Sequence, residues 1–396
     1  MNIILFDGEV RSQLLPLTYT RPVGNLRIGI LTINEKWERT LNASVSYKTE
    51  EYLTPKFPMI VSSENILIHG GLCPDGKVEG EIEKLKLGER LVFEEKIIAV
   101  HIAENDMGNF FEGSYSFTKD VIYTDSILII EHPWDLFAKN AEALEIDFAR
   151  ITNGRESQPI SSTNTLIGNR VFLEEGAIVE GAILNSKSGP IYVGKEAEIM
   201  EGCLVRGGLA LCEHAGLKMG AKIYGATTVG PHSKAGGEVN NSIIYAYSNK
   251  GHDGFIGNTV IGEWCNLGAD TNTSNLKNNY AKVRVWEYDS GRFADTGLQF
   301  CGLIMGDHSK SGINTMFNTG TVIGVSANVF GGGFPRNFIP SFSWGGASGM
   351  IEFRYNKAAE VAQAMMGRRG LSYDEVEEGI VKTVFDNTAI YRKNLK

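Results

Sequence analysis

The clearest candidate for chemistry is a histidine in a polar, glycine-rich segment, Asn249-Lys250-Gly251-His252-Asp253-Gly254. An imidazole titrates near neutral pH, so it can accept a proton from an attacking amine. Backbone N–H groups in the glycine-rich corner Gly268-Ala269 could stabilise an oxyanion, and Asn266 and Asn275 could orient a polar acceptor. These residue types suit acyl transfer from a thioester to an amine. The alternative is that His252 only caps a turn.

The element expected to position these residues is a solenoid. From about Leu166 to Gly333, aliphatic residues recur every six positions, a period that fits neither an α-helix nor a simple alternating strand. The repeat runs through Ile167, Leu173, Val179, Ile199, Val205, Met305, Ser311, Phe317, Ile323 and Val329. Small or medium residues follow four places later at Val171, Ala177, Ile183, Cys203, Ser309, Thr315, Thr321 and Ala327. Short parallel strands that turn a corner every six residues explain this pattern, which predicts a hexapeptide β-helix.

The repeat is interrupted at Ser186-Pro190, Gly208-Lys218 and Asp270-Phe300. We expect these three stretches to leave the regular coil. Such excursions commonly line binding sites, because they are free of the packing constraints of the repeat.

The flanking regions predict further elements. Residues 1–131 have a mixed α/β pattern, with strands expected at 2–6, 65–68, 90–93 and 121–130 and a helix at 28–39. Pro133 precedes an apolar stripe typical of an amphipathic helix. We therefore expect an α/β domain at 1–131, a linker helix at 132–158, a β-helix at 159–345 and a helical cap at 346–396. Within the cap, helices are expected at 357–366 and 372–391.

Composition restricts the class of protein. The chain has 396 residues, is 42% hydrophobic and carries a formal net charge of −9. A chain of this length and hydrophobic content has room for two domains. Its negative net charge argues against nucleic-acid binding. No apolar run is long enough for a membrane span, and the five cysteines lack CxxC spacing, so a disulfide framework is not expected. A soluble protein of the reducing cytoplasm is expected.

The segment from Lys250 to Leu276 resembles the acetyltransferase half of the bifunctional UDP-N-acetylglucosamine pyrophosphorylase/glucosamine-1-phosphate N-acetyltransferases. The shared pattern is Gly251-His252, Phe255, a glycine-bounded hexad and Asn266-Leu267-Gly268-Ala269-Asp270-Thr271, followed by Asn275. The resemblance implies that His252 is the general base and that Asn275 positions the substrate. It further implies that Asn266 binds the sugar and that the backbone of Ala269 meets the acetyl group of acetyl-CoA.

This resemblance implies a left-handed β-helix and a coenzyme wall at Gly312 and Asn314. Two departures concern the substrate. Phe255 replaces a tyrosine of the bacterial enzymes, and the family's phosphate-binding lysine falls near Asn240-Asn241. Phosphate binding would then come from other cations, for which Lys250, Lys282 and Arg284 are candidates, along with Lys277 and Arg292.

A weaker pattern lies near the N-terminus. Arginines follow the first predicted strand in the order Asp7-Gly8, Arg11, Arg21 and Arg27, and guanidinium groups match phosphoryl oxygens. The segment resembles a degenerate sugar-nucleotidyltransferase signature, with Pro16-Leu17-Thr18 and Pro22 retained. Gly8, Arg11, Arg21 and Arg27 are therefore expected to bind the nucleotide and sugar phosphate. The usual metal-binding Asp is missing after Asn65-Ile68, and Asp7, Asp75 and Glu131 are possible substitutes.

Taken over the whole chain, the resemblance is to an alternative bacterial version of this bifunctional family, loose over 1–150 and close over 160–335. It implies acetylation of glucosamine 1-phosphate from acetyl-CoA, joined to uridylyl transfer that uses a nucleoside triphosphate and Mg²⁺. It further implies a homotrimer. One alternative is a nucleotidyltransferase of other sugar specificity whose β-helix only assembles the oligomer. Another is a zinc-dependent hydratase that uses His214, His232, His252 and His308.

Overall fold

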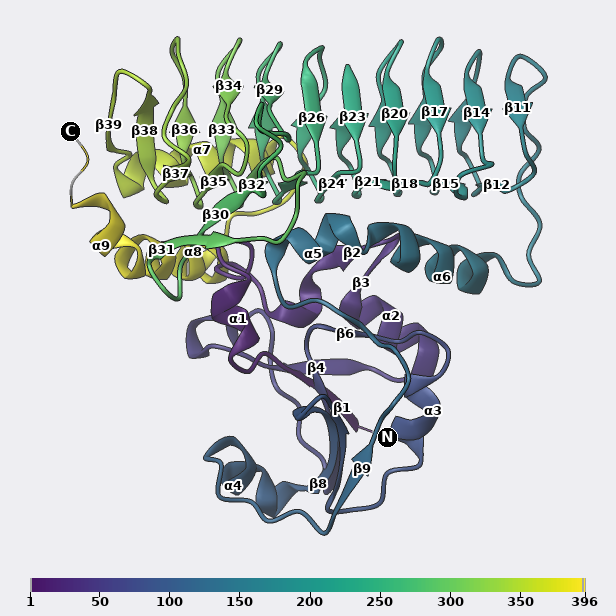
Figure 1. Ribbon diagram of the computed structural model, residues 1–396, viewed down its shortest axis with the longest axis vertical. Coiled ribbons are helices and arrows are strands. Elements are labelled where there is room, and N and C mark those ends of the chain that lie inside the picture. Colours follow the sequence, from purple (N-terminus) through teal and green to yellow (C-terminus); the bar gives the residue numbers. More distant parts are fainter. Residues whose placement is uncertain (1, 394, 396) are drawn as a thin grey trace. The chain divides into compact units, whose positions relative to one another are not determined.

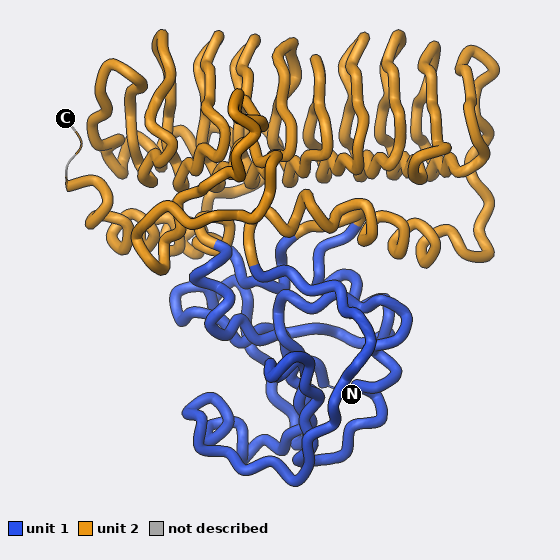
Figure 2. The backbone as a smooth tube through the Cα atoms, in the orientation of Figure 1, with its two compact units in different colours: residues 1–14, 21–26, 31–131 blue, residues 15–20, 27–30, 132–396 orange. Residues whose placement is uncertain are grey.

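A computed structural model describes residues 2–393 and residue 395, and the chain divides into two compact units. The first unit comprises residues 1–14, 21–26 and 31–131, and the second comprises 15–20, 27–30 and 132–396 (Figure 2). The division after Glu131 coincides with the expected domain boundary. The inclusion of two short N-terminal segments in the second unit was not indicated by any sequence pattern.

The first unit is built on a mixed sheet with the strand order β4-β1-β5-β8-β7-β9. Strands β4, β1 and β5 are parallel, whereas β8 runs antiparallel to both β5 and β7. The sheet strands are β1 (Asn2–Phe6), β4 (Val45–Lys48), β5 (Glu64–His69), β7 (Glu89–Phe93), β8 (Lys96–Ala103) and β9 (Lys119–Ile122). The helices of this unit are α1 (Val10–Gln13), α2 (Ile33–Leu41), α3 (Val78–Glu83) and α4 (Met107–Phe111).

Two expectations for the first unit were wrong. The predicted helix at 28–39 begins only at Ile33, because Thr32 and Glu35 form a capping box there and Gly29 has a φ of +69°. The predicted strand at 121–130 is divided between β9 and β10 (Leu128–Ile129), and β10 pairs with β6 (Leu72–Cys73) outside the main sheet.

The second unit is a parallel β-solenoid with three sheets, followed by helices, as the six-residue period predicted (Figure 1). The first sheet contains β11 (Thr165–Ile167), β14 (Ile183–Asn185), β17 (Leu204–Arg206), β20 (Lys222–Tyr224), β23 (Glu238–Asn240) and β26 (Phe255–Gly257). The second contains β12 (Val171–Leu173), β15 (Ile191–Val193), β18 (Leu209–Leu211), β21 (Thr227–Val229), β24 (Ile243–Ile244), β27 (Val260–Ile261), β32 (Ile304–Met305), β35 (Val322–Ile323) and β37 (Phe338–Ile339). The third contains β13 (Ile178–Val179), β16 (Glu198–Ile199), β19 (Gly216–Leu217), β22 (Lys234–Ala235), β25 (Asn249–Lys250), β28 (Asn266–Leu267), β33 (Lys310–Ser311), β36 (Asn328–Val329), β38 (Ser343–Gly346) and β39 (Gly349–Glu352).

The solenoid core consists of the inward positions of the repeat. Leu173, Val179, Ile199, Val205 and Met305 belong to one continuous buried cluster. Stacking of the coils therefore buries apolar surface that no single coil could cover. Ile183 differs from the prediction, since it is 41% exposed while its neighbour Leu184 faces inward.

The expected excursions had different outcomes. The segment Asp270–Phe300 does leave the coil, and it carries an antiparallel hairpin of β30 (Arg284–Glu287) and β31 (Arg292–Asp295) between β29 (Asn272–Thr273) and β32. The segment Gly208–Lys218 does not, because it forms the regular strands β18 and β19. Strand β29, at the start of the excursion, pairs with β34 (Met316–Phe317) in a separate two-stranded sheet.

Helices flank the solenoid in sequence. The linker contains α5 (Pro133–Ala138) and α6 (Asn140–Thr152) rather than one continuous helix. The C-terminal region contains α7 (Tyr355–Gly367), α8 (Glu375–Asn387) and α9 (Ala389–Arg392). In the described part of the chain, no helix combines the length and apolar character that crossing a bilayer requires.

Candidate active site

His252 lies at an exposed corner of the solenoid between β25 and β26. Its backbone is fixed by Lys250, whose side chain is only 1% exposed. The Lys250 ammonium donates hydrogen bonds to the carbonyl oxygens of Gly236 (3.2 Å), Asp253 (3.0 Å) and His252. The expectation that Lys250 binds a substrate phosphate was therefore wrong. Its donors are used inside the protein, and the residue positions the His252 turn.

Burial has a further effect on Lys250. Loss of solvation lowers the pKa of its ammonium to about 8, an effect that the nearby carboxylates of Asp253 and Asp270 oppose. The three carbonyl oxygens supply the polar contacts that a buried cation requires.

The corners of three successive coils lie in register along one edge. The Asp270 N–H donates to the Asp253 carbonyl (3.0 Å), and the Asn314 N–H donates to the Ala269 carbonyl (2.8 Å). These bonds place the His252 corner, the Ala269 corner and the Asn314 corner side by side. The structure thus brings together three segments that are separated by up to 62 positions in sequence.

Close stacking makes glycine necessary at this edge. A Cβ atom on Gly268 would lie 2.5 Å from the carbonyl carbon of Gly312, which is backbone and cannot move aside. Among the hydrogen bonds of residues 2–393 and 395, none uses the N–H of Ala269. That N–H is therefore available to an oxyanion at the corner next to His252.

The remaining predicted substrate residues are more dispersed. Asn266 is exposed on the third sheet, next to Asn249 of the preceding coil. Asn275 follows β29, at the opposite end of the strand from the corner edge, and its amide donates to Asn258 Oδ1 (2.9 Å). Lys282 and Arg284 belong to the excursion, where the Arg284 guanidinium donates to the Phe293 carbonyl. Of these four residues, only Asn266 belongs to the third sheet, which also contains the strand before His252.

A column of stacked rings runs along another edge of the solenoid. Its members are His214, His232, Tyr247, Trp264 and His308, all with a φ between 53° and 61°. Successive ring centroids lie 4.6, 4.9, 4.2 and 6.3 Å apart, with interplanar angles of 14° or less. This column contradicts the zinc alternative, since its histidine rings stack face to face instead of converging on one point. Across the described chain, no group of three or more His, Cys, Asp or Glu side chains could hold a metal.

The N-terminal candidates have other partners within the protein. Arg11, whose side chain is 13% exposed, donates to the Tyr52 hydroxyl (2.6 Å) and the Glu50 carboxylate (3.3 Å). Gly8 forms an exposed turn with a φ of +54°, and Arg21 is buried. Arg27 belongs to the second unit, where its N–H donates to the Tyr245 hydroxyl (3.0 Å) and its guanidinium donates to the Ile30 carbonyl. Arg27 is thus held inside the second unit, and its role in nucleotide binding stays a prediction.

The carboxylates expected to replace the metal-binding Asp do not form a metal site. Asp7 accepts hydrogen bonds from the Val23 N–H (2.8 Å) and the Thr49 hydroxyl (2.5 Å), so both of its oxygens are used. Asp75 accepts from backbone N–H groups of its own turn, and Glu131 pairs with Lys96. With these partners, the three carboxylates do not fit a magnesium ion.

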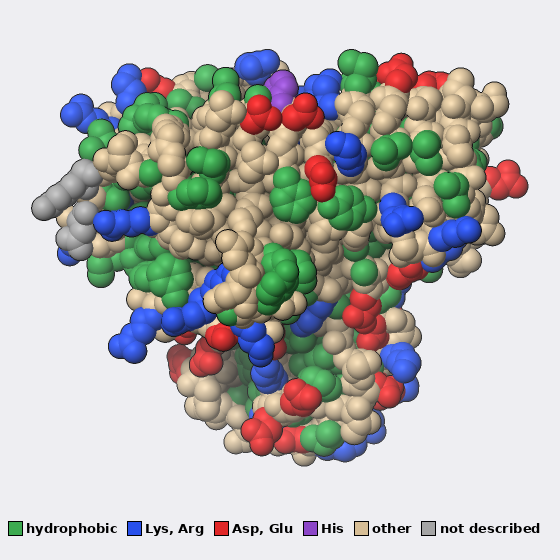
Figure 3. All heavy atoms as spheres, turned by 45° about the horizontal axis from the view of Figure 1, so that its top comes forward, with side chains coloured by type: hydrophobic (Ala, Val, Ile, Leu, Met, Phe, Trp, Pro, Cys, Tyr) green, Lys and Arg blue, Asp and Glu red, His purple; other side chains and the backbone are tan. Residues whose placement is uncertain are grey.

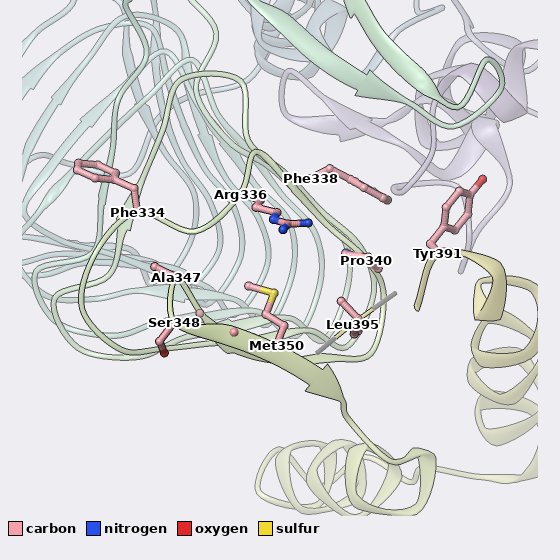
Figure 4. Close-up of a pocket in the computed structure, with 11 residues that line it drawn as sticks. Phe334, Arg336, Phe338, Pro340, Ala347, Ser348, Met350, Tyr391 and Leu395 are labelled. Carbon is pink, nitrogen blue, oxygen red and sulfur yellow. The ribbon is translucent and has the colours of Figure 1, made fainter. Parts of the chain in front are cut away.

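Two cavities of the second unit were not foreseen. One, of about 420 Å³, lies by the last coil and is lined by Arg336, Phe338, Met350 and Tyr391, among others (Figure 4). None of its lining residues is a predicted site residue. The other, of about 410 Å³, lies on the third sheet and includes Asn266. A row of lysines and asparagines at equivalent positions of successive coils could have indicated it.

Known proteins share parts of this sequence. Residues 3–156 match the family model described as sugar nucleotidyl transferase. The resemblance inferred from the motifs is confirmed. The match continues past Glu131 to the end of the linker helices, so the family region is longer than the first unit.

The most similar curated relatives include two archaeal proteins. One is a bifunctional sugar-1-phosphate nucleotidylyltransferase/acetyltransferase of Sulfurisphaera tokodaii, 28% identical over 56% of this chain and 57% of its own length. The other is the bifunctional protein GlmU of Methanocaldococcus jannaschii, 29% identical over 65% of this chain and 54% of its own length. The chain thus spans little more than half the length of these relatives. The name of the first states two transferase activities, and the name of the second states that the protein is bifunctional.

Among solved structures, a UDP-N-acetylglucosamine acyltransferase from Bacteroides fragilis matches with 12% identity and a TM-score of 0.27, over 60% of this chain and 98% of its own. The strand ladders of the chain itself show the β-solenoid.

Proposed function

We propose that this protein transfers the acetyl group of acetyl-CoA to the amino group of an amino sugar 1-phosphate, with glucosamine 1-phosphate as the first candidate. The observation that carries the proposal is the alignment of the His252, Ala269 and Asn314 corners on successive coils. Along this edge lie a possible base, the His252 imidazole, a backbone N–H, that of Ala269, and the closely stacked glycines Gly268 and Gly312. The relative from Sulfurisphaera tokodaii, whose name includes an acetyltransferase, supports the same activity.

In the proposed reaction the His252 imidazole accepts a proton from the amine nitrogen as that nitrogen attacks the thioester carbonyl carbon. The N–H of Ala269 stabilises the oxyanion of the tetrahedral intermediate. The carbon–sulfur bond then breaks, and the released thiolate takes up a proton to leave as the CoA thiol. Exposure of His252 allows both substrates to approach the corner.

The same proposal assigns nucleotidyl transfer to the N-terminal region. There the acetylated sugar 1-phosphate would attack UTP to give UDP-N-acetylglucosamine and pyrophosphate, with Gly8, Arg11 and Arg21 near the phosphates. The match of residues 3–156 to the sugar nucleotidyl transferase family supports this assignment. An activity measurement with and without Mg²⁺ would test the expected dependence of this transfer on the metal.

A second candidate is a nucleotidyltransferase of other sugar specificity in which the solenoid only assembles the oligomer. Exposed apolar side chains favour an assembling surface, since Ile183 (41% exposed) and Leu204 (46% exposed) lie next to each other on the first sheet. A cytoplasmic homotrimer is compatible with both candidates. Light scattering of the purified protein would measure the number of subunits.

One experiment separates the two candidates. The protein is mixed with acetyl-CoA, UTP, Mg²⁺ and a panel of sugar 1-phosphates with and without an amino group, and thiol and pyrophosphate are measured separately. The first candidate predicts thiol release that depends on the amino group. Pyrophosphate release without any thiol would leave only the second candidate, and release of neither product would refute both.

A further inference from the structure

The second cavity of the solenoid is a groove with a regular floor. Lys234, Asn249, Asn266 and Lys310 come from β22, β25, β28 and β33 and are register partners from each strand to the next. Their side chains therefore form one row across four coils. Since neighbouring strands are about 4.8 Å apart, the row is about 14 Å long. We refer to this cavity as the cationic groove.

The walls of the cationic groove come from the ring column and from the C-terminal region. Tyr247 and Trp264 of the ring column line it, as do Met365, Arg368 and Arg369 at the end of α7 and just beyond it. The Arg369 guanidinium donates to the His232 carbonyl (3.4 Å), and the Lys310 ammonium donates to the His308 carbonyl (2.7 Å). These two cations are thus fixed against the ring column.

The charge of the cationic groove is unbalanced. Four cations line it and no carboxylate does, although the whole chain carries a net charge of −9. On the face shown in Figure 3, by contrast, acidic and basic side chains are interspersed. In the described chain, the side chains of Lys234, Arg368, Asn249 and Asn266 make no hydrogen bond or ion pair. Four unbalanced cations repel one another unless an anion joins them.

The donor set selects the kind of anion. Paired guanidinium groups and ammonium groups match the several oxygens of a phosphoryl group, and the two asparagine amides can bond to further oxygens or hydroxyls. A carboxylate, with a single charge, would leave most of the positive charge uncompensated. A volume of about 410 Å³ accommodates a ligand of the size of a sugar phosphate.

Two residues on the floor of the cationic groove lie close in sequence to the candidate active site. Asn249 precedes His252 by three positions, and Asn266 precedes Ala269 by three. We infer that the cationic groove binds the phosphoryl group of the substrate whose reacting atoms lie at the His252 corner. This inference deepens the proposed function and depends on it for the identity of the substrate. It assigns a binding role to Lys234, Lys310, Arg368 and Arg369, and gives the C-terminal residues more than the capping role expected from sequence.

Direct binding tests the inference without any turnover. Dissociation constants are measured by calorimetry for inorganic phosphate, glucosamine 1-phosphate and adenosine 3′,5′-bisphosphate, the last standing for the phosphates of CoA. The variants are Arg368→Gln/Arg369→Gln and the single exposed change Lys234→Gln. A Lys86→Gln/Lys187→Gln protein removes two exposed lysines elsewhere and serves as the charge-matched control. Because each charged hydrogen bond is worth a factor of ten or more, the double variant should weaken binding at least about tenfold.

Each outcome is decisive. Weaker binding of glucosamine 1-phosphate alone assigns the groove to the sugar phosphate, and weaker binding of the bisphosphate alone assigns it to the coenzyme. Either result supports the inference, and it does so even if no thiol is released, in which case only the proposed reaction fails. The inference is overturned if the wild type binds none of the probes, or if the groove variants bind like the control. Lys234→Gln keeps the test valid should the double variant fail to fold.

Discussion

Lys250 holds the backbone of the turn that carries His252. The sequence pattern singles out both residues, but it predicts that Lys250 binds the substrate phosphate. The spacing of residues does not reveal whether an ammonium group faces the interior of the protein. Burial to 1% exposure and three carbonyl partners make it a positioning residue. The candidate base was thus predictable from its motif, whereas its support was not.

Replacing Lys250 with methionine removes the donor while keeping a side chain of similar length. We expect kcat for acetyl transfer to fall about tenfold or more with little change in KM, since the His252 turn loses its charged hydrogen bonds. Steady-state kinetics measures both constants. Lys187→Met, on an exposed surface, is the control. Unchanged kcat in a normally folded Lys250→Met protein would remove the positioning role.

The raised pKa of Asp7 predicts how the stability of the fold changes with pH. Burial raises its pKa from 3.8 to about 6, against the lowering effect of hydrogen bonds from Thr49 and Val23 and of the Arg11 charge. A raised pKa stabilises the fold below pH 3.8, and this contribution is lost as the pH rises through 6. The loss amounts to at most about 3 kcal/mol.

The Asp7→Asn variant does not titrate, so the wild type should lose stability relative to it between pH 4 and pH 7. Hydrogen exchange of peptides from β1 and β5, corrected for the intrinsic exchange rate, measures this difference. A wild type that gains stability relative to the variant over the same range would show that the assigned direction is wrong.

At the scale of elements, periodicity was the reliable signal. The six-residue repeat predicted the solenoid because each inward residue must fit the coil above and the coil below. Local patterns failed where a distant contact determines the backbone. The linker helix is interrupted before Asn140, whose buried amide donates to the Ala226 carbonyl and whose oxygen accepts from the Gly29 N–H. No pattern within the linker indicates those partners.

The stacked corners predict different costs for two glycines. Gly268→Ala should destabilise the solenoid by about 1–3 kcal/mol, because the new methyl group would meet the Gly312 backbone at 2.5 Å. Gly251→Ala should be nearly neutral, since an added Cβ would meet nothing within 4 Å there. Thermal unfolding of both variants measures the contrast. Equal midpoints would mean that the corners are not packed as described.

At the scale of the whole molecule, the two units are not separated by a single boundary in the sequence. Residues 15–20 and 27–30 belong to the solenoid unit, where the Thr228 hydroxyl donates to the Gly29 carbonyl (2.8 Å) and Asp147 accepts from the Ile30 N–H (2.8 Å). A boundary drawn from sequence composition could not show this, because the partners lie more than 100 positions away.

A fragment of residues 132–396 therefore lacks part of its own unit. We expect it to unfold at a lower temperature than the solenoid within the full chain, because the buried side chains of Asn140, Asp147 and Tyr245 lose partners. Calorimetry of both proteins measures the difference. A fragment as stable as the intact chain would show that the two N-terminal segments contribute little.

The central claim is that His252 is the base for acetyl transfer. Its most direct test is the initial rate of thiol release from acetyl-CoA with glucosamine 1-phosphate, compared between the wild type, His252→Ala and the exposed control Lys187→Met. Because a general base contributes about 10²- to 10⁴-fold, His252→Ala should be slower by at least about a hundredfold while the control stays within a few-fold of the wild type. A His252→Ala protein that releases thiol at the wild-type rate would contradict the account.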